Sequence, residues 1–121
     1  MATSTQNLTF LDSKTGLTWQ LGFSKLLSWD EAQTYAESLD CDCGGWRLPT
    51  RHELMSLVDD TRINPAIDTT IFPDTPAEWF WTSTVALSGK SCVWYVNFST
   101  GHSDNYFKHH EASKMHVRCV R

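Results

Sequence analysis

Apolar residues recur at helical spacing after Ser28. The segment carries them at intervals of three and four residues: Trp29, Ala32, Ala36 and Leu39. This spacing predicts an amphipathic helix with one buried face. Ser28 and Glu31 form a capping box, which marks its first turn. A second capping box, Thr50 with Glu53, predicts another helix over residues 51–59.

Other segments have the composition or alternation of β-strands. These are residues 8–11, 17–20, 79–84, 92–98, 103–108 and 114–120. The first two read as a hairpin, because the polar loop between them contains a glycine. Residues 60–78 contain three X-Pro steps and predict a long irregular connection. The last three strands predict a C-terminal three-stranded antiparallel meander. The fold class is therefore α+β, with two helices packed on a small antiparallel sheet.

A chain of 121 residues is long enough for one domain. We predict that this domain spans residues 8–121 and that residues 1–7 form a flexible N-terminal tail. With 40% hydrophobic and 20% charged residues, it is neither disordered nor fibrous. No apolar run reaches the roughly 20 residues of a membrane helix, so we expect no membrane insertion. The first residues do not resemble a signal peptide, which leaves a cytoplasmic location open.

Charge is unevenly distributed around the formal net of −4. Residues 28–80 hold eleven acidic residues against three arginines, whereas residues 81–121 hold five basic residues against two acidic ones. This weakly basic end favours an anionic or hydrogen-bonding partner. It is too sparse to predict nucleic-acid binding.

Four cysteines could form disulfides: Cys41, Cys43, Cys92 and Cys119. A bond between the first two is disfavoured by the strained ring it would close. The other pairings link that pair to Cys92, to Cys119 or to both, and four reduced thiols are the alternative. Cysteines one residue apart do not have zinc-site spacing.

No catalytic or metal-binding motif stands out. His109 and His110 are adjacent, so on an extended chain they point to opposite faces and at most one of them can join His116 in a metal site without a turn. Solvated loop histidines are the expectation. Nucleophile elbows, zinc-protease motifs and phosphate loops are absent. We therefore expect no enzymatic activity, metal or cofactor.

Eight segments in order resemble a known family. They are TGLTWQ (15–20), WDEA (29–32), GWRLPT (45–50) with Glu53-Leu54, NPAID (64–68), Phe72-Pro73, WFWTST (79–84), VWYVNF (93–98) with Gly101, and VRCVR (117–121). Together they resemble the domain at the C-terminus of the Legionella collagen-like protein, over about residues 8–121. The resemblance implies a C-type-lectin-like fold.

The resemblance also implies a binding module. Family members include adhesin tips that bind sulfated glycans and variable proteins of diversity-generating retroelements, in which a stretch ending near VRCVR carries ligand-contacting positions. Here that stretch is about 94–116. The ligand-binding residues it predicts are Tyr95, Asn97, His102, Asp104, Asn105, Tyr106, Phe107, His109, His110, Glu111, Ser113 and Met115. The motifs of calcium-dependent sugar binding are absent, so we do not expect that mode.

Three hypotheses follow. The first is a retroelement-type variable protein that binds a protein or glycan at a cell or phage surface. The second is a fixed adhesin-type module that binds anionic glycans, with a trimer or other homo-oligomer as its assembly. The third is a structural domain with no ligand of its own.

Overall fold

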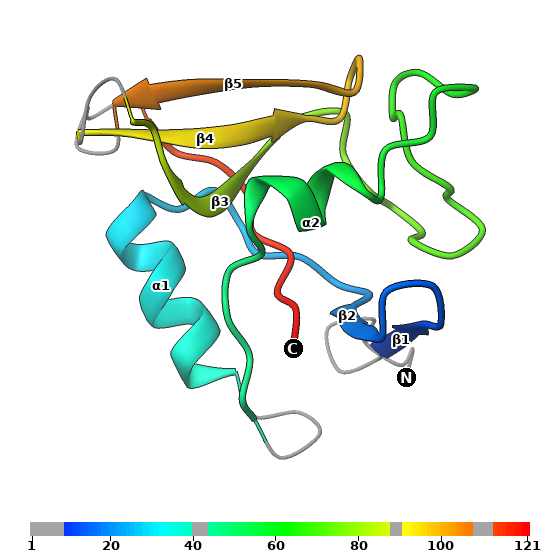
Figure 1. The fold of residues 1–121 in the computed structure, drawn as a ribbon, viewed down its shortest axis with the longest axis horizontal. Helices are drawn as coiled ribbons and strands as arrows, with labels where there is room; N and C mark the ends of the chain where they lie inside the picture. The colour runs from blue at the N-terminus through cyan, green and yellow to red at the C-terminus, as the bar shows by residue number, and fades with distance from the viewer. Residues whose placement is uncertain (1–8, 40–43, 88–90, 108–112) are drawn as a thin grey trace.

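The computed structural model describes residues 9–39, 44–87, 91–107 and 113–121. The elements in chain order are β1 (Thr9–Asp12), β2 (Leu17–Gln20), α1 (Trp29–Ser38), α2 (Arg51–Met55), β3 (Trp79–Val85), β4 (Cys92–Asn97) and β5 (His102–Phe107) (Figure 1). Strands β1 and β2 form the predicted hairpin, and a second antiparallel sheet has the order β3-β4-β5. The α+β class is confirmed.

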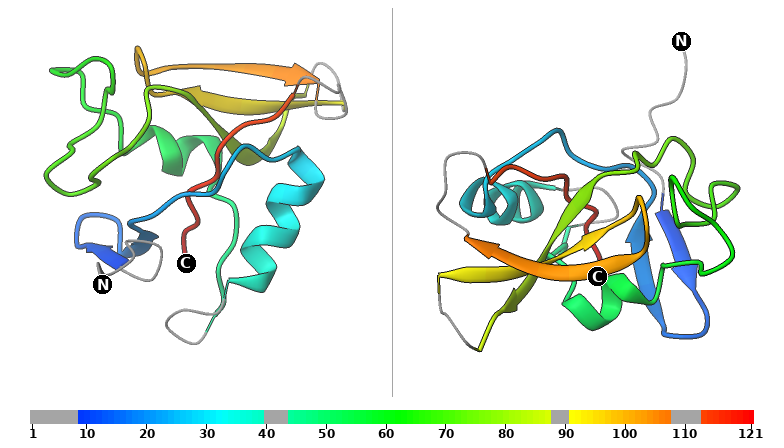
Figure 2. Two further views of the ribbon diagram at one scale, coloured as in Figure 1. Left: turned by 180° about the vertical axis from the view of Figure 1, so that it is seen from behind. Right: turned by 90° about the horizontal axis from the view of Figure 1, so that it is seen from above.

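The two helices pack on opposite faces of the three-stranded sheet (Figure 2). Consecutive residues of a strand point to opposite faces. Trp81 of β3 accordingly lies in a buried cluster with Ala32 and Ala36 of α1. Its neighbour Phe80 lies in a second cluster with Leu54 of α2. The sheet is therefore supported from both sides.

Helix α1 begins at the predicted capping box. The Ser28 hydroxyl accepts a hydrogen bond from the Glu31 N–H over 3.2 Å, and the Ser28 N–H donates to Glu31 Oε1 over 2.9 Å. The corresponding pair at α2, Thr50 and Glu53, makes the same two bonds. Both predicted helix starts are confirmed.

Helix α2 is shorter than the predicted 51–59. Beyond Met55 the chain continues in tighter turns, in which the N–H of Val58 bonds to the carbonyl of Met55 over 3.1 Å. The N–H of Asp59 then bonds to the carbonyl of Ala66 over 2.8 Å. The helix ends because the following loop takes up its next backbone donor. Residues 60–78, all described, contain no helix or strand, as predicted.

The prediction that residues 114–120 form the third strand of a C-terminal meander is wrong. Met115 forms an antiparallel bridge with Leu27, and His116 forms a parallel bridge with Phe80. The segment therefore runs along β3, on the side of the sheet away from β5. Met115 and Val117 are fully buried there, whereas an edge position beside β5 would leave apolar side chains in water.

No described helix could cross a membrane, since none is both long and apolar enough. Cys92 is half-buried and Cys119 is buried, and they are not bonded to each other. Cys41 and Cys43 lie outside the described residues, so pairings that involve them stay predictions.

Candidate functional site: an open aromatic face of the sheet

One face of the three-stranded sheet brings together predicted ligand-binding residues. Tyr95 of β4 pairs with Asp104 of β5, and the neighbouring pairs place the other members on the same side. Directly paired side chains share a face of the sheet. We call this group the aromatic face: Trp79, Tyr95, His102, Asp104 and Tyr106.

Trp79 lies on the solvent side of Tyr95 in the aromatic face. Its indole stacks on the Tyr95 ring with centroids 4.4 Å apart and planes 15° from parallel. Tyr106 meets Trp79 edge-on, with a centroid distance of 6.4 Å. Trp79 is 40% exposed, while Tyr95 beneath it is 9% exposed. Large aromatic area is therefore presented to solvent on an aromatic support.

Asp104 gives the aromatic face a negative charge. It lies exposed on β5 opposite Tyr95, and its Oδ1 accepts a hydrogen bond from the Asn105 N–H over 2.8 Å. Burial raises the pKa of the Tyr95 phenol, and the charge of Asp104 and the proximity of Tyr106 raise it further. Tyr95 therefore stays neutral, and Asp104 is the only acidic member of the face.

The aromatic face is the α1 side of the sheet, next to the buried Trp81 and Val93. On the α2 side, an arginine lies over the same strands. The guanidinium of Arg51 lies 3.8 Å from the centroid of the Trp94 ring. Its Nε donates to the Ser103 hydroxyl over 3.1 Å, and that hydroxyl donates to the Tyr95 carbonyl over 2.8 Å. An arginine of the chain thus covers the tryptophan on this side.

The remaining predicted site residues are dispersed. Asn105 and Phe107 lie on the Trp94 side of β5, and Phe107 is 54% exposed. Asn97 pairs with both Trp79 and His102 at the turn end of the aromatic face, where its side chain accepts a hydrogen bond from the Ser99 N–H over 2.9 Å. His109, His110 and Glu111 lie outside the described residues.

Two predicted contact residues are not on the surface. Ser113 and Met115 are each 1% exposed. Met115 belongs to the cluster beneath α1, because its backbone is held by Leu27. These two residues cannot contribute to an exposed binding surface, which corrects their assignment.

Sequence reasoning missed two features of the surface. Core packing is the usual role of a tryptophan in such a segment, yet Trp79 is an exposed residue of the site. Its alternation with buried Phe80 is the signal that could have found it. Arg118 counted toward the basic C-terminal end, but it is completely buried, so its charge does not contribute to a binding surface.

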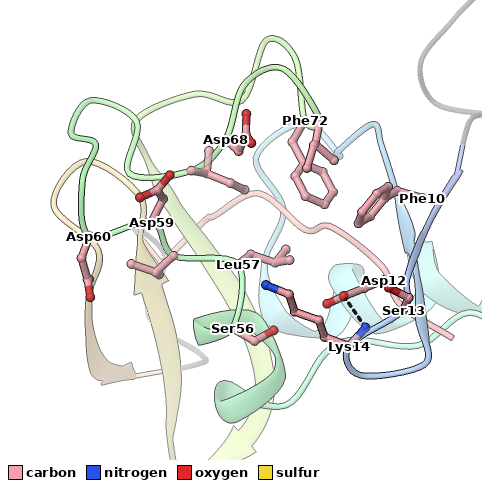
Figure 3. A pocket seen from close by; sticks show the side chains of 13 residues that line it. Phe10, Asp12, Ser13, Lys14, Ser56, Leu57, Asp59, Asp60, Asp68 and Phe72 are labelled. Carbon is pink, nitrogen blue, oxygen red and sulfur yellow. Dashed lines mark hydrogen bonds between the residues drawn. The ribbon is translucent and has the colours of Figure 1, made fainter.

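A pocket of about 460 Å³ lies elsewhere, between the β1–β2 hairpin and the loop after α2 (Figure 3). Its apolar wall includes Phe10 and Phe72, and Asp59 and Asp68 stand at its rim. Hydrogen bonds from threonines two residues further along lower the pKa of both carboxyls, and Arg62 lowers them further. Within the described part of the chain, no three acidic, histidine or cysteine side chains gather as a metal site requires.

Comparison with known proteins identifies the family. The family model of the Lcl C-terminal domain matches residues 8–121. A comparison with curated proteins found no match. The matched range contains every described helix and strand, including those that carry the aromatic face. The chain therefore belongs to the Lcl C-terminal domain family.

Proposed function

We propose that this protein is a non-enzymatic recognition module that binds a protein or glycan through the aromatic face. The observation that carries the proposal is the exposure of Trp79, which stacks on Tyr95, the β4 partner of Asp104, on a doubly supported sheet. Binding surfaces are enriched in tyrosine and tryptophan, which offer large contact area at low entropic cost. Polar neighbours such as His102 supply orientation.

A fixed backbone supports this role. The edge of β3 is closed by the C-terminal segment, where Trp81 N–H donates to the His116 carbonyl and His116 N–H donates to the Trp79 carbonyl, both over 3.0 Å. Trp79 is therefore held by the C-terminal segment as well as by its pairing with Asn97 of β4. Sites on strands hold their geometry better than sites on loops.

We further propose that the scaffold has a C-type-lectin-like fold. In this proposal the protein is a variable protein of a diversity-generating retroelement, displayed on a cell or phage. Two features support it. Arg121 lies beside β2, with mutual backbone bonds of 2.8 and 2.9 Å between Thr18 and Arg121. Exposed β5 positions such as His102 and Asp104 alternate with residues of the supporting side. The negative charge of Asp104 argues against the alternative of an anionic-glycan adhesin.

The test is a library that randomises four residues of the aromatic face together: Trp79, His102, Asp104 and Tyr106. If these positions form a binding surface on an independent scaffold, most members fold, and phage selection against lysozyme yields binders. A matched library at four buried positions, Val93, Val96, Val117 and Val120, should lose folded members. Loss of folding in the first library contradicts the proposal.

A genomic observation tests the retroelement part alone. We expect a near-copy of the segment that encodes residues 94–116, differing at adenines, beside a reverse transcriptase gene. If the genomic neighbourhood contains neither the near-copy nor the reverse transcriptase gene, the retroelement hypothesis is rejected. The hypothesis of a fixed binding module then remains.

A further inference from the structure

We propose that the ligand of the aromatic face is an arginine side chain of a partner protein, with its guanidinium stacked on Trp79 and hydrogen-bonded to Asp104. This inference rests on the proposed function and names the chemistry of the group that is recognised.

The ring supplies the first half of the site. Tyr95 stacks on one face of the Trp79 indole with ring centroids 4.4 Å apart, and Trp79 is 40% exposed. Tryptophan has the most favourable aromatic face for a cation. Stacking also fixes the indole against Tyr95, so little ordering is required when a ligand arrives.

The carboxylate supplies the second half. Asp104 lies opposite Tyr95, which is the residue that supports the indole. Its Oδ1 already accepts one hydrogen bond, from Asn105, and each carboxylate oxygen has two lone pairs. Acceptor capacity therefore remains for a guanidinium, which pairs with carboxylates in a planar fork.

The same sheet contains an internal example of this arrangement. On the opposite face, Arg51 stacks on Trp94 at 3.8 Å and donates to an acceptor on β5, the hydroxyl of Ser103. The aromatic face also offers a tryptophan and a β5 acceptor, although here the tryptophan, Trp79, lies on β3 and β4 separates it from Asp104. Among the cation–ring contacts of the described residues, none involves Trp79. An arginine stacked on Trp79 would therefore come from another molecule.

Charge and shape select this occupant. A sulfated glycan would place its negative groups beside Asp104, and such like-charge contact is unfavourable. A lysine ammonium is a compact, strongly hydrated charge, whereas guanidinium is planar and stacks on aromatic rings. A protein segment with an exposed arginine fits both the indole and the carboxylate.

The test is an NMR titration of the full chain with Nα-acetyl-arginine amide, with Nα-acetyl-lysine amide as the matched probe. We expect saturable shifts at the Trp79 indole N–H and at the amides of Asp104 and Tyr95, with weaker binding of the lysine probe. Asp104→Asn should weaken arginine binding about fivefold, as expected when an exposed ion pair is lost. Asp60→Asn, an exposed control on another loop, should leave the affinity unchanged.

Two results would overturn the inference. One is the absence of a saturable shift at Trp79. The other is arginine binding that Asp104→Asn does not weaken. Neither result removes the proposed function if library selection at the aromatic face still yields binders. If the library loses its folded members, the proposed function is contradicted. The arginine inference is then still tested by itself, because the titration uses the unvaried chain.

Discussion

Asp104 covers the open edge of the sheet by accepting, at Oδ1, a hydrogen bond of 2.8 Å from the N–H of Asn105. The backbone N–H groups of β5 point alternately toward β4 and toward the open edge of the sheet. Because Asp104 pairs with Tyr95 of β4, the N–H of the next residue, Asn105, points outward. Unpaired donors on edge strands are templates for association with another chain. The carboxylate therefore protects this edge as well as charging the aromatic face.

We predict that Asp104→Ala increases self-association, because it uncovers the outward N–H of Asn105 and removes a repelling charge. Light scattering during size-exclusion chromatography over a range of concentrations would measure it against the wild type. Asp104→Asn is the matched control, since its amide oxygen can still accept the bond. Equal masses for wild type and Asp104→Ala at all concentrations would contradict this role.

A second prediction concerns the turn between β4 and β5. Gly101 has a φ of +85°, and a Cβ there would lie 2.8 Å from Cγ1 of Val58. Gly101→Ala adds a steric clash to left-handed backbone strain, and we expect it to lower the free energy of unfolding by about 2 kcal/mol or more.

The control for this turn is Gly16→Ala. Gly16 has a φ of +76°, and nothing lies within 4 Å of the position that a Cβ would take there. Only the backbone cost of about 1 kcal/mol applies at this glycine. Urea denaturation of both variants measures the difference. Equal destabilisation would show that the contact with Val58 is relieved by local movement.

A third prediction is an acid-dependent contribution of Glu53. Its hydrogen bonds and ion pair with Arg47 lower its pKa from 4.5 to about 2, and bonds from Thr50 assist. A lowered carboxyl pKa stabilises the native state above the unfolded-state pKa, and this stabilisation is lost as the pH falls toward the native value. The stability difference between wild type and Glu53→Gln should therefore shrink between pH 4.5 and about 2.

Unfolding by urea at several pH values measures this effect. Arg47→Met should show the same loss of acid sensitivity, because it removes the largest cause of the shift. A difference between wild type and Glu53→Gln that is constant with pH would contradict the lowered pKa. Since the pair is partly exposed, raising the salt concentration should weaken the effect.

The fourth prediction concerns the buried Arg118. It donates to the carbonyls of Gln20 and Leu21 and to the Thr75 hydroxyl, and the ring of Phe72 lies 4.7 Å from its guanidinium carbon. Burial lowers its pKa to about 9, so it remains charged at neutral pH. It lies in the core as a cation held by carbonyls and aromatic rings.

We expect Arg118→Ala to destabilise the fold by about 3–5 kcal/mol, because it leaves a cavity and buried acceptors without a donor. Arg118→Met should cost less, since its side chain fills the apolar space beside Phe72. Thermal and urea unfolding distinguish the two variants. If Arg118→Met destabilises the fold as much as Arg118→Ala, the lost hydrogen bonds, rather than the lost side-chain volume, account for most of the destabilisation.

Local patterns were reliable predictors in this protein. Both helix starts, Ser28 with Glu31 and Thr50 with Glu53, were predicted because a capping box acts within four residues. The β1–β2 hairpin was predicted for the same reason, since its loop residues determine its turn. The α+β class followed from the order of these elements.

Alternation in residues 114–120 correctly indicated a buried face but not its neighbour. The same pattern suits any strand with one apolar side, so pairing with β5 could not be distinguished from pairing with the Leu27 segment. Trp79 was predicted to be buried for a similar reason. A strand rich in aromatic residues predicts burial, but it does not show how much of the strand the neighbouring helix covers. The predicted ligand-binding residues on β5 came from the resemblance, and the strand divides them between its two sides. His102, Asp104 and Tyr106 lie on the aromatic face, whereas Asn105 and Phe107 lie on the Trp94 side.

The amino-acid order determined the capped helices, the turns and the alternation of polar and apolar side chains, because each arises from contacts between near neighbours. The tertiary structure decided which faces are covered: Met115 is enclosed by Leu27 and α1, while Trp79 remains exposed on top of Tyr95. Burial depends on segments that lie far apart in the chain, and their packing is a property of the whole fold.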